Sequence, residues 1–151
     1  MASGWYNRGK KLWSEYASGR TTKPSNFYFA LVTASYTPDA DHATWATPDG
    51  NEIAAGNGYT QHGQAVAASN VGFDASSQDD SGDTGEIQLA DIVWTASGGD
   101  IPASGGGARY LIMMDDNATE TSRELIAYFD LGSDKTTSVS LTLQDFALEL
   151  A

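Results

Sequence analysis

Two histidines and several nearby carboxylates are the residues of this sequence that could bind a metal ion. His42 and His62 are its two histidines, and Asp39, Asp41 and Glu52 lie close to them along the chain. Imidazole nitrogens and carboxylate oxygens are ligands that zinc and similar ions prefer. However, the histidines lack the short spacing that places two imidazoles on one helix or strand. We therefore expect two loop histidines with polar neighbours, and the sequence predicts neither a metal site nor a cofactor.

The segment NEIAAGNGYTQHG, residues 51–63, has the glycine content of a phosphate-binding loop. It has G-x-G but not G-x-G-x-x-G, no P-loop lysine follows it, and it leads into a strand rather than a helix. A turn explains the glycine content of this segment better than phosphate binding does. Gly56 and Gly58 are expected to adopt positive φ before Tyr59 begins a strand that contains His62.

Acidic residues cluster in DDSGDTGE, where Asp79, Asp80, Asp83 and Glu86 surround a glycine. Carboxylate oxygens bind calcium, but these residues lack the register and the final glutamate of an EF-hand loop. We expect residues 75–85 to form an acidic polar loop, with DDSGDTGE as a solvated acidic hairpin loop and weak calcium binding as the alternative.

Catalysis by a pair of carboxylates is the remaining chemical possibility. Glu124 and Asp130 lie in or beside apolar segments, as the acids of a glycosidase can. Charges at strand ends or edges also discourage aggregation, and we prefer that explanation. There is no G-x-S-x-G motif, and neither histidine lies in a recognisable triad context. The sequence therefore predicts no catalytic residue and a protein that is not an enzyme.

Charge is distributed unevenly along the 151 residues. Residues 1–23 have five basic side chains and one acidic one, a net charge of +4, whereas residues 24–151 have three basic and nineteen acidic ones, a net charge of −16. So acidic a body argues against direct binding of nucleic acid, which needs a basic face. No apolar run suits a membrane span or a secretory signal, and the lack of cysteine excludes disulfides.

The N-terminal segment 1–23 is predicted to be a basic amphipathic helix or arm. Within it, residues 4–19 fit one helix that ends at Gly19. Two tryptophans in so short a helix require burial, either against the rest of the chain or against a neighbouring subunit. We predict an interface made of the aromatic and basic residues of this helix: Trp5, Arg8, Lys10, Lys11, Trp13 and Tyr16.

Residues 24–151 are predicted to form a single β domain. Apolar and β-branched runs between glycine, proline and polar clusters indicate strands. About six to eight strands favour a mainly β fold, a β-sandwich or jelly-roll-like barrel, with the short N-terminal helix added. The runs that predict strands are 26–36, 59–74, 86–96, 108–116, 123–132 and 136–150.

The phase of the apolar pattern changes inside two of these runs. In 86–96 it changes near residues 90–91, and in the last run it changes at 144–145. A β-bulge at each point would restore a common inward face. The runs 108–116 and 123–132 are apolar on both faces, so we expect them to form a central hairpin between two layers.

Five segments follow one another in a distinctive order: FYFALVTASYTPDADHATW, NEIAAGNGYTQHGQAV, VWTASGGDIPASGGGARYLIMMDD, ELIAYFDLG and a terminal VSLTLQ. From about residue 5 to residue 145, this order resembles that of small structural proteins of tailed-phage virions, although the acidic loop and TWATPDG depart from the pattern. The resemblance implies a non-enzymatic component on the outer surface of a capsid or tail. Its first implication is a capsid decoration (cement) protein, trimeric at the threefold positions of the shell and bound to the major capsid protein or other virion proteins.

Three other functions stay open at this point. One is a tail- or fibre-associated protein that helps to recognise the host. A second is a carbohydrate-binding module, with or without calcium, that uses Trp45, Tyr59 and Trp94 as exposed aromatic residues. The third is an enzyme that acts on glycans, which needs two carboxylates on a concave face.

Overall fold

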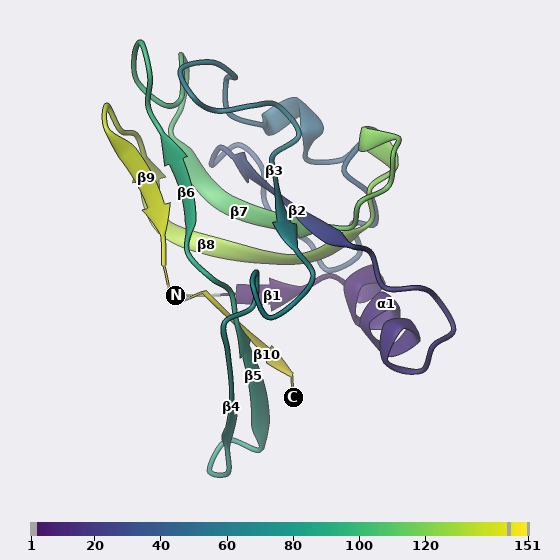
Figure 1. Ribbon diagram of the computed structural model, residues 1–151. Coiled ribbons are helices and arrows are strands. Elements are labelled where there is room, and N and C mark those ends of the chain that lie inside the picture. The colour runs from purple at the N-terminus through teal and green to yellow at the C-terminus, as the bar shows by residue number, and fades with distance from the viewer. Residues whose placement is uncertain (1–2, 145, 151) are drawn as a thin grey trace.

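The computed structural model describes residues 3–144 and 146–150 and confirms a mainly β fold with a short N-terminal α-helix (Figure 1). The sheets are antiparallel and resemble a β-sandwich in their layering. None of the described helices is long and apolar enough to cross a membrane. In chain order the elements are β1 Ser3–Trp5, α1 Asn7–Ala17, β2 Asn26–Val32, η1 Asp49–Asn51, β3 Gln64–Ala67, β4 Ala75–Asp79, β5 Thr84–Gln88, β6 Ile92–Thr95, β7 Ala108–Met114, η2 Glu120–Ser122, β8 Leu125–Lys135, β9 Ser140–Leu143 and β10 Ala147–Leu150.

The strands pair in three sheets. The largest has the order β1-β8-β7-β2-β3, the second β10-β5-β4, and the third β6-β9. The predicted hairpin is confirmed, because β7 pairs with β8 and both lie in the interior of the largest sheet. A bulge between Met113 and Met114 shifts the register of that pair.

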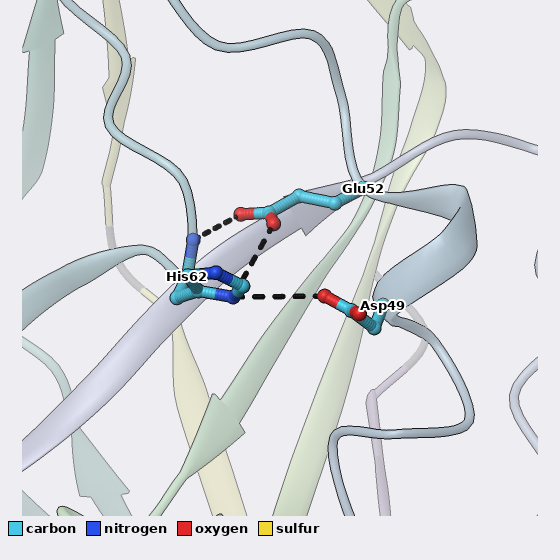
Figure 2. A group of neighbouring side chains, drawn as sticks. All are labelled: Asp49, Glu52 and His62. Atoms are coloured by element: carbon cyan, nitrogen blue, oxygen red, sulfur yellow. Dashed lines mark hydrogen bonds and ion pairs between the residues drawn. The ribbon is translucent and has the colours of Figure 1, made fainter. Parts of the chain in front are cut away.

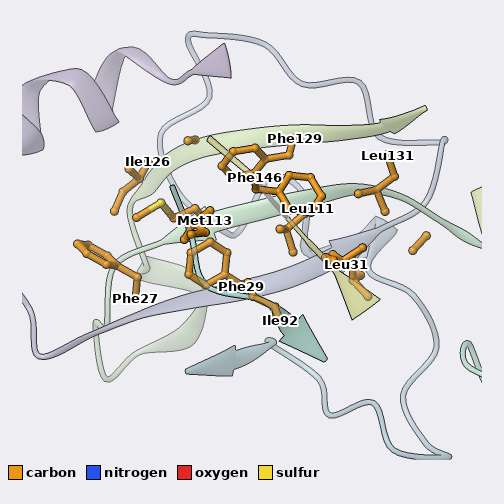
Figure 3. Close-up of a cluster of buried hydrophobic side chains, with 14 of the residues drawn as sticks. Phe27, Phe29, Leu31, Ile92, Leu111, Met113, Ile126, Phe129, Leu131 and Phe146 are labelled. Atoms are coloured by element: carbon orange, nitrogen blue, oxygen red, sulfur yellow. The ribbon is translucent and has the colours of Figure 1, made fainter. Parts of the chain in front are cut away.

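The central strands β2, β7 and β8 are buried on both faces, as their apolar runs predict. Phe29 and Leu31 of β2 contribute to one core cluster (Figure 3), whereas the alternating residues Ala30 and Val32 contribute to a second. Alternate side chains of a strand point to opposite faces, so such a sheet needs a covering layer on each side. Residues from helix α1 and from the two smaller sheets cover the first face, including Leu12, Ile92, Trp94, Leu143 and Leu148. The connection between β2 and β3 contributes Tyr36 and Trp45 to the second cluster.

The N-terminal segment differs from the single helix expected over residues 4–19. Residues Ser3–Trp5 form a strand that pairs with β8, and α1 begins only at Asn7. This strand lies close to its partner at Gly4, since a Cβ there would lie 2.5 Å from the tip of the Tyr128 side chain, which would have to shift. The helix ends as predicted near Gly19, which has φ +69°.

The acidic hairpin loop expected at DDSGDTGE is confirmed as the exposed turn at residues 80–83, but the rest of 75–85 is not a loop. Strands β4 and β5 form a hairpin there, and it extends away from the largest sheet in Figure 1. All of β4 is exposed, so it lacks the apolar alternation by which a half-buried strand is recognised in a sequence. The turn is completed by Asp83 at φ 52°.

The two phase changes mark passages between sheets rather than bulges within one strand. The run 86–96 leaves the hairpin sheet after β5 and enters the third sheet as β6. The last run leaves the third sheet after β9 and enters the hairpin sheet as β10. Asp145, half of the predicted second bulge, lies outside the described residues. Leu143, Phe146 and Leu148 are nevertheless all buried, which is the common inward face that the pattern required.

Gly9 supplies a direct test of the packing of the helix on the sheet. A Cβ at this buried position would lie 2.0 Å from the backbone oxygen of Ile126 in β8. In an exposed helix, alanine would stabilise by about 1 kcal/mol over glycine. Here we expect Gly9→Ala to lower the free energy of unfolding by about 2 kcal/mol, because the backbone of β8 cannot move aside.

Urea unfolding followed by circular dichroism measures that change. Gly85→Ala is the matched control, since a Cβ there would meet nothing within 4 Å, and its effect should stay within about 0.5 kcal/mol. A Gly9→Ala protein as stable as the wild type would contradict the close contact between α1 and β8.

Candidate functional site

A buried carboxylate lies in the connection between β2 and β3. The side chain of Glu52 is only 2 % exposed. Its Oε1 accepts a hydrogen bond of 2.7 Å from the hydroxyl of Tyr59, and that hydroxyl accepts one of 3.0 Å from the backbone N–H of Leu31. Burial raises the pKa of Glu52, and the hydrogen bond from Tyr59 partly opposes the shift. Through these two hydrogen bonds, Tyr59 ties the carboxylate to Leu31 of β2, an inner strand of the largest sheet.

His62 lies beside Glu52 in a turn, so the expectation that it falls inside a strand is wrong. Its backbone has φ +62°, and its N–H donates to Glu52 Oε1 at 2.7 Å. The carbonyl of His62 accepts a bond of 2.8 Å from Nη1 of Arg123, a buried guanidinium that lies 3.6 Å from the ring centre of Tyr28. These contacts hold a conformation that non-glycine residues rarely adopt. The expected positive φ of Gly56 and Gly58 is confirmed, at 118° and 104°.

Asp49, Glu52 and His62 bring three possible metal ligands together (Figure 2). One atom of each lies within 4.8 Å of the others. Nδ1 of His62 is 3.6 Å from Asp49 Oδ1 and 3.9 Å from Glu52 Oε2. Nε1 of the buried Trp45 lies 3.0 Å from Asp49 Oδ1 and 3.2 Å from His62 Nδ1. The group can hold a proton or a cation among its acceptor atoms.

Only part of this group was expected from the sequence. Of the five candidate ligands, Glu52 and His62 meet, while the others have different partners. Nδ1 of His42 lies 2.9 Å from the hydroxyl of Tyr36, Asp41 accepts from Asn7, and Asp39 accepts from the backbone of Asp41. Asp49 was missed, although the turn signal TPDG places it three residues before Glu52.

The other carboxylate candidates do not form a pair with each other. Glu124 forms an ion pair with Arg8, and Asp130 accepts bonds of 2.8 and 3.0 Å from Arg109, which lowers the pKa of Asp130. In the acidic hairpin, Asp79 accepts hydrogen bonds from the backbone and hydroxyl of Ser81. Glu124, Asp130 and Asp79 are therefore each occupied by a partner of their own and do not form a catalytic pair.

The aromatic residues expected at a carbohydrate surface are buried, so that expectation is wrong. Trp45, Tyr59 and Trp94 are 0 %, 2 % and 3 % exposed. Tyr59 and Trp94 contact each other, with ring centres 6.1 Å apart inside the first core cluster. Their polar, glycine-rich context in the sequence conceals burial that comes from distant strands.

The predicted N-terminal interface contains two kinds of residue. The aromatic residues Trp5, Trp13 and Tyr16 are half-buried against the first core cluster of their own chain. Of the cations, Arg8 pairs with Glu124 and Lys11 with Glu15, while Lys10 is exposed. The interface itself stays a prediction, and Lys10 and Lys11 are its most exposed members.

Comparison of the chain with protein families, curated proteins and solved structures finds no match.

Tyr59→Phe tests the polar network around Glu52. The substitution leaves Glu52 Oε1 with one donor fewer and leaves the buried N–H of Leu31 without an acceptor. We expect the free energy of unfolding to fall by about 1–3 kcal/mol, measured by urea denaturation.

Tyr110→Phe is the control for loss of a tyrosine hydroxyl. Within residues 3–144 and 146–150, no hydrogen bond to the hydroxyl of Tyr110 is found, and its loss should change stability by less than about 0.5 kcal/mol. Equal effects of the two substitutions would mean that the hydroxyl of Tyr59 does not hold Glu52.

Proposed function

We propose that this protein is a non-enzymatic structural component of a tailed-phage virion, most simply a capsid decoration protein that stabilises the head. The order of segments that resembles virion proteins is one support. The observation that carries the proposal further is the separation of charge between a basic helix and an acidic body, because it provides two complementary surfaces for assembly.

The exposed cations lie on and just after α1. Lys10 and Arg20 are exposed, in a segment whose net charge is +4. The projecting β4–β5 hairpin is exposed along β4 and bears Asp79, Asp80 and Asp83. A contact between unlike surfaces of successive copies is heterologous, and it forms a closed ring when the rotation between copies closes. A trimer at a threefold position of the shell is one such ring.

The inward packing of the aromatic residues agrees with this function. Trp5, Trp13 and Tyr16 secure the helix to its own body, which leaves its charged outer face for a neighbour. Charge complementarity of this kind sets orientation and rate of association more than final affinity. A neighbour that presents an acidic surface, either another copy or the shell, fits the helix.

Mass spectrometry and imaging of purified particles test the proposal. We expect the chain in many ordered copies on the head. Absence from particles would overturn the proposal, and a location at the tail alone would replace decoration by the tail-associated alternative.

Charge reversal tests the basic helix surface. We expect Lys10→Glu to weaken self-association or binding to undecorated heads by roughly three- to tenfold at low salt, with a smaller effect at high salt. Multi-angle light scattering and a particle-binding assay measure these two interactions.

Lys135→Glu is the matched control, because it changes net charge equally from a position outside the N-terminal segment. If both reversals weakened binding equally, the helix would have no specific part in assembly.

A further inference from the structure

One oxygen of the buried Glu52 carboxylate has no hydrogen-bond partner among the residues that the structure describes. Oε1 accepts hydrogen bonds from Tyr59 and from the backbone of His62, whereas Oε2 accepts none. The side chain is 2 % exposed, so this oxygen is shielded from bulk water. A buried carboxylate oxygen without a donor or cation is costly. In Figure 2, Oε2 points toward the imidazole of His62, the same ring that Asp49 approaches.

The imidazole of His62 is oriented as in a metal-binding histidine. Its Nε2 lies 3.1 Å from Oε2 of Glu120, so a hydrogen on Nε2 is directed at that carboxylate. Nδ1 keeps a lone pair on the side of the ring where Asp49 and Glu52 lie, and this lone pair accepts a hydrogen bond of 3.2 Å from the indole N–H of Trp45. A cation bound to Nδ1 would take the place of that hydrogen. A second carboxylate behind a histidine is the arrangement that fixes the tautomer and raises the basicity of a metal ligand.

We propose that Asp49 Oδ1, Glu52 Oε2 and His62 Nδ1 bind a divalent cation of the zinc class. Around a tetrahedral ion with bonds of about 2.0–2.1 Å, neighbouring ligand atoms are about 3.4 Å apart. The separations of 3.6 and 3.9 Å from Nδ1 are close to that value. The imidazole ligand favours zinc, cobalt or nickel over calcium and magnesium, which prefer oxygen. Three protein ligands leave a fourth position for water.

The surrounding contacts hold the ligands in place. Tyr59 fixes Glu52, and Arg123 holds the carbonyl of His62. The indole N–H of Trp45 is shared between Asp49 Oδ1 and His62 Nδ1 and holds these two ligand atoms near each other until a cation replaces its bond to Nδ1. Asp49 and His62 are 35 % and 21 % exposed, which leaves a route from solvent. A bound cation would join η1 to the turn before β3 and would neutralise part of the charge that two carboxylates bring together. The site is independent of the proposed virion function, since no residue of the basic helix takes part.

Zinc titration of the metal-free protein tests the site. At a zinc concentration about 100 times Kd, the thermal midpoint should rise by roughly 5 °C or more. Co²⁺ should give the visible absorption of a tetrahedral site and should be displaced by Zn²⁺. Calcium and magnesium at the same concentrations should give no comparable rise. Absence of both the zinc-dependent rise and the cobalt absorption in the wild-type chain would overturn the proposal.

His62→Asn removes the imidazole, and asparagine tolerates the positive φ of this position. We expect it to abolish the zinc-dependent rise and the cobalt absorption, while His42→Asn, at the chain's other histidine, preserves both. Glu120→Gln, at a side chain 50 % exposed, keeps the assay usable if His62→Asn fails to fold, and it should weaken zinc binding about tenfold. Zinc binding equal to wild type in both His62→Asn and Glu120→Gln would overturn the assignment.

Discussion

The burial of the central strands on both faces is the constraint on which the rest of this structure depends. Strands β2, β7 and β8 present apolar side chains to both sides, and burial of each face removes that surface from water. One face is covered with the help of α1 and the smaller sheets, and the other with Tyr36 and Trp45 from the long connection after β2. The short strands β6, β9 and β10 each cover part of the first face.

Covering the second face with an irregular connection creates the polar network. A connection without regular pairing must find other partners for its buried polar groups. Tyr59, Glu52, His62 and Arg123 meet that need, and they fix the backbone of residues 49–62 against β2. The unpartnered oxygen of Glu52 is an exception within this network, and the proposed cation site rests on it.

The surface is organised by charge, whereas the core is organised by apolar packing. Aromatic residues of the N-terminal segment face inward, and the exposed residues of that segment are largely polar and basic. The acidic residues are spread over the body and concentrated on the projecting hairpin. Unlike charges on the helix and on the hairpin provide complementary surfaces, and such complementarity sets the orientation and rate of association more than the affinity.

The sequence by itself determined the fold class, the β7–β8 hairpin and the turn at Gly56 and Gly58. Periodicity and glycine placement report local burial and backbone conformation, and these depend on neighbours in the chain. Strand β1 and the passages between sheets carried no such signal, because their pairing is with distant segments. The β4–β5 hairpin is local, but β4 is exposed along its whole length and so lacks the apolar alternation that reports a strand. The meeting of Asp49, Glu52 and His62 was likewise decided by tertiary structure. Three loop residues without regular spacing converge only because the central sheet fixes both ends of the connection that contains them.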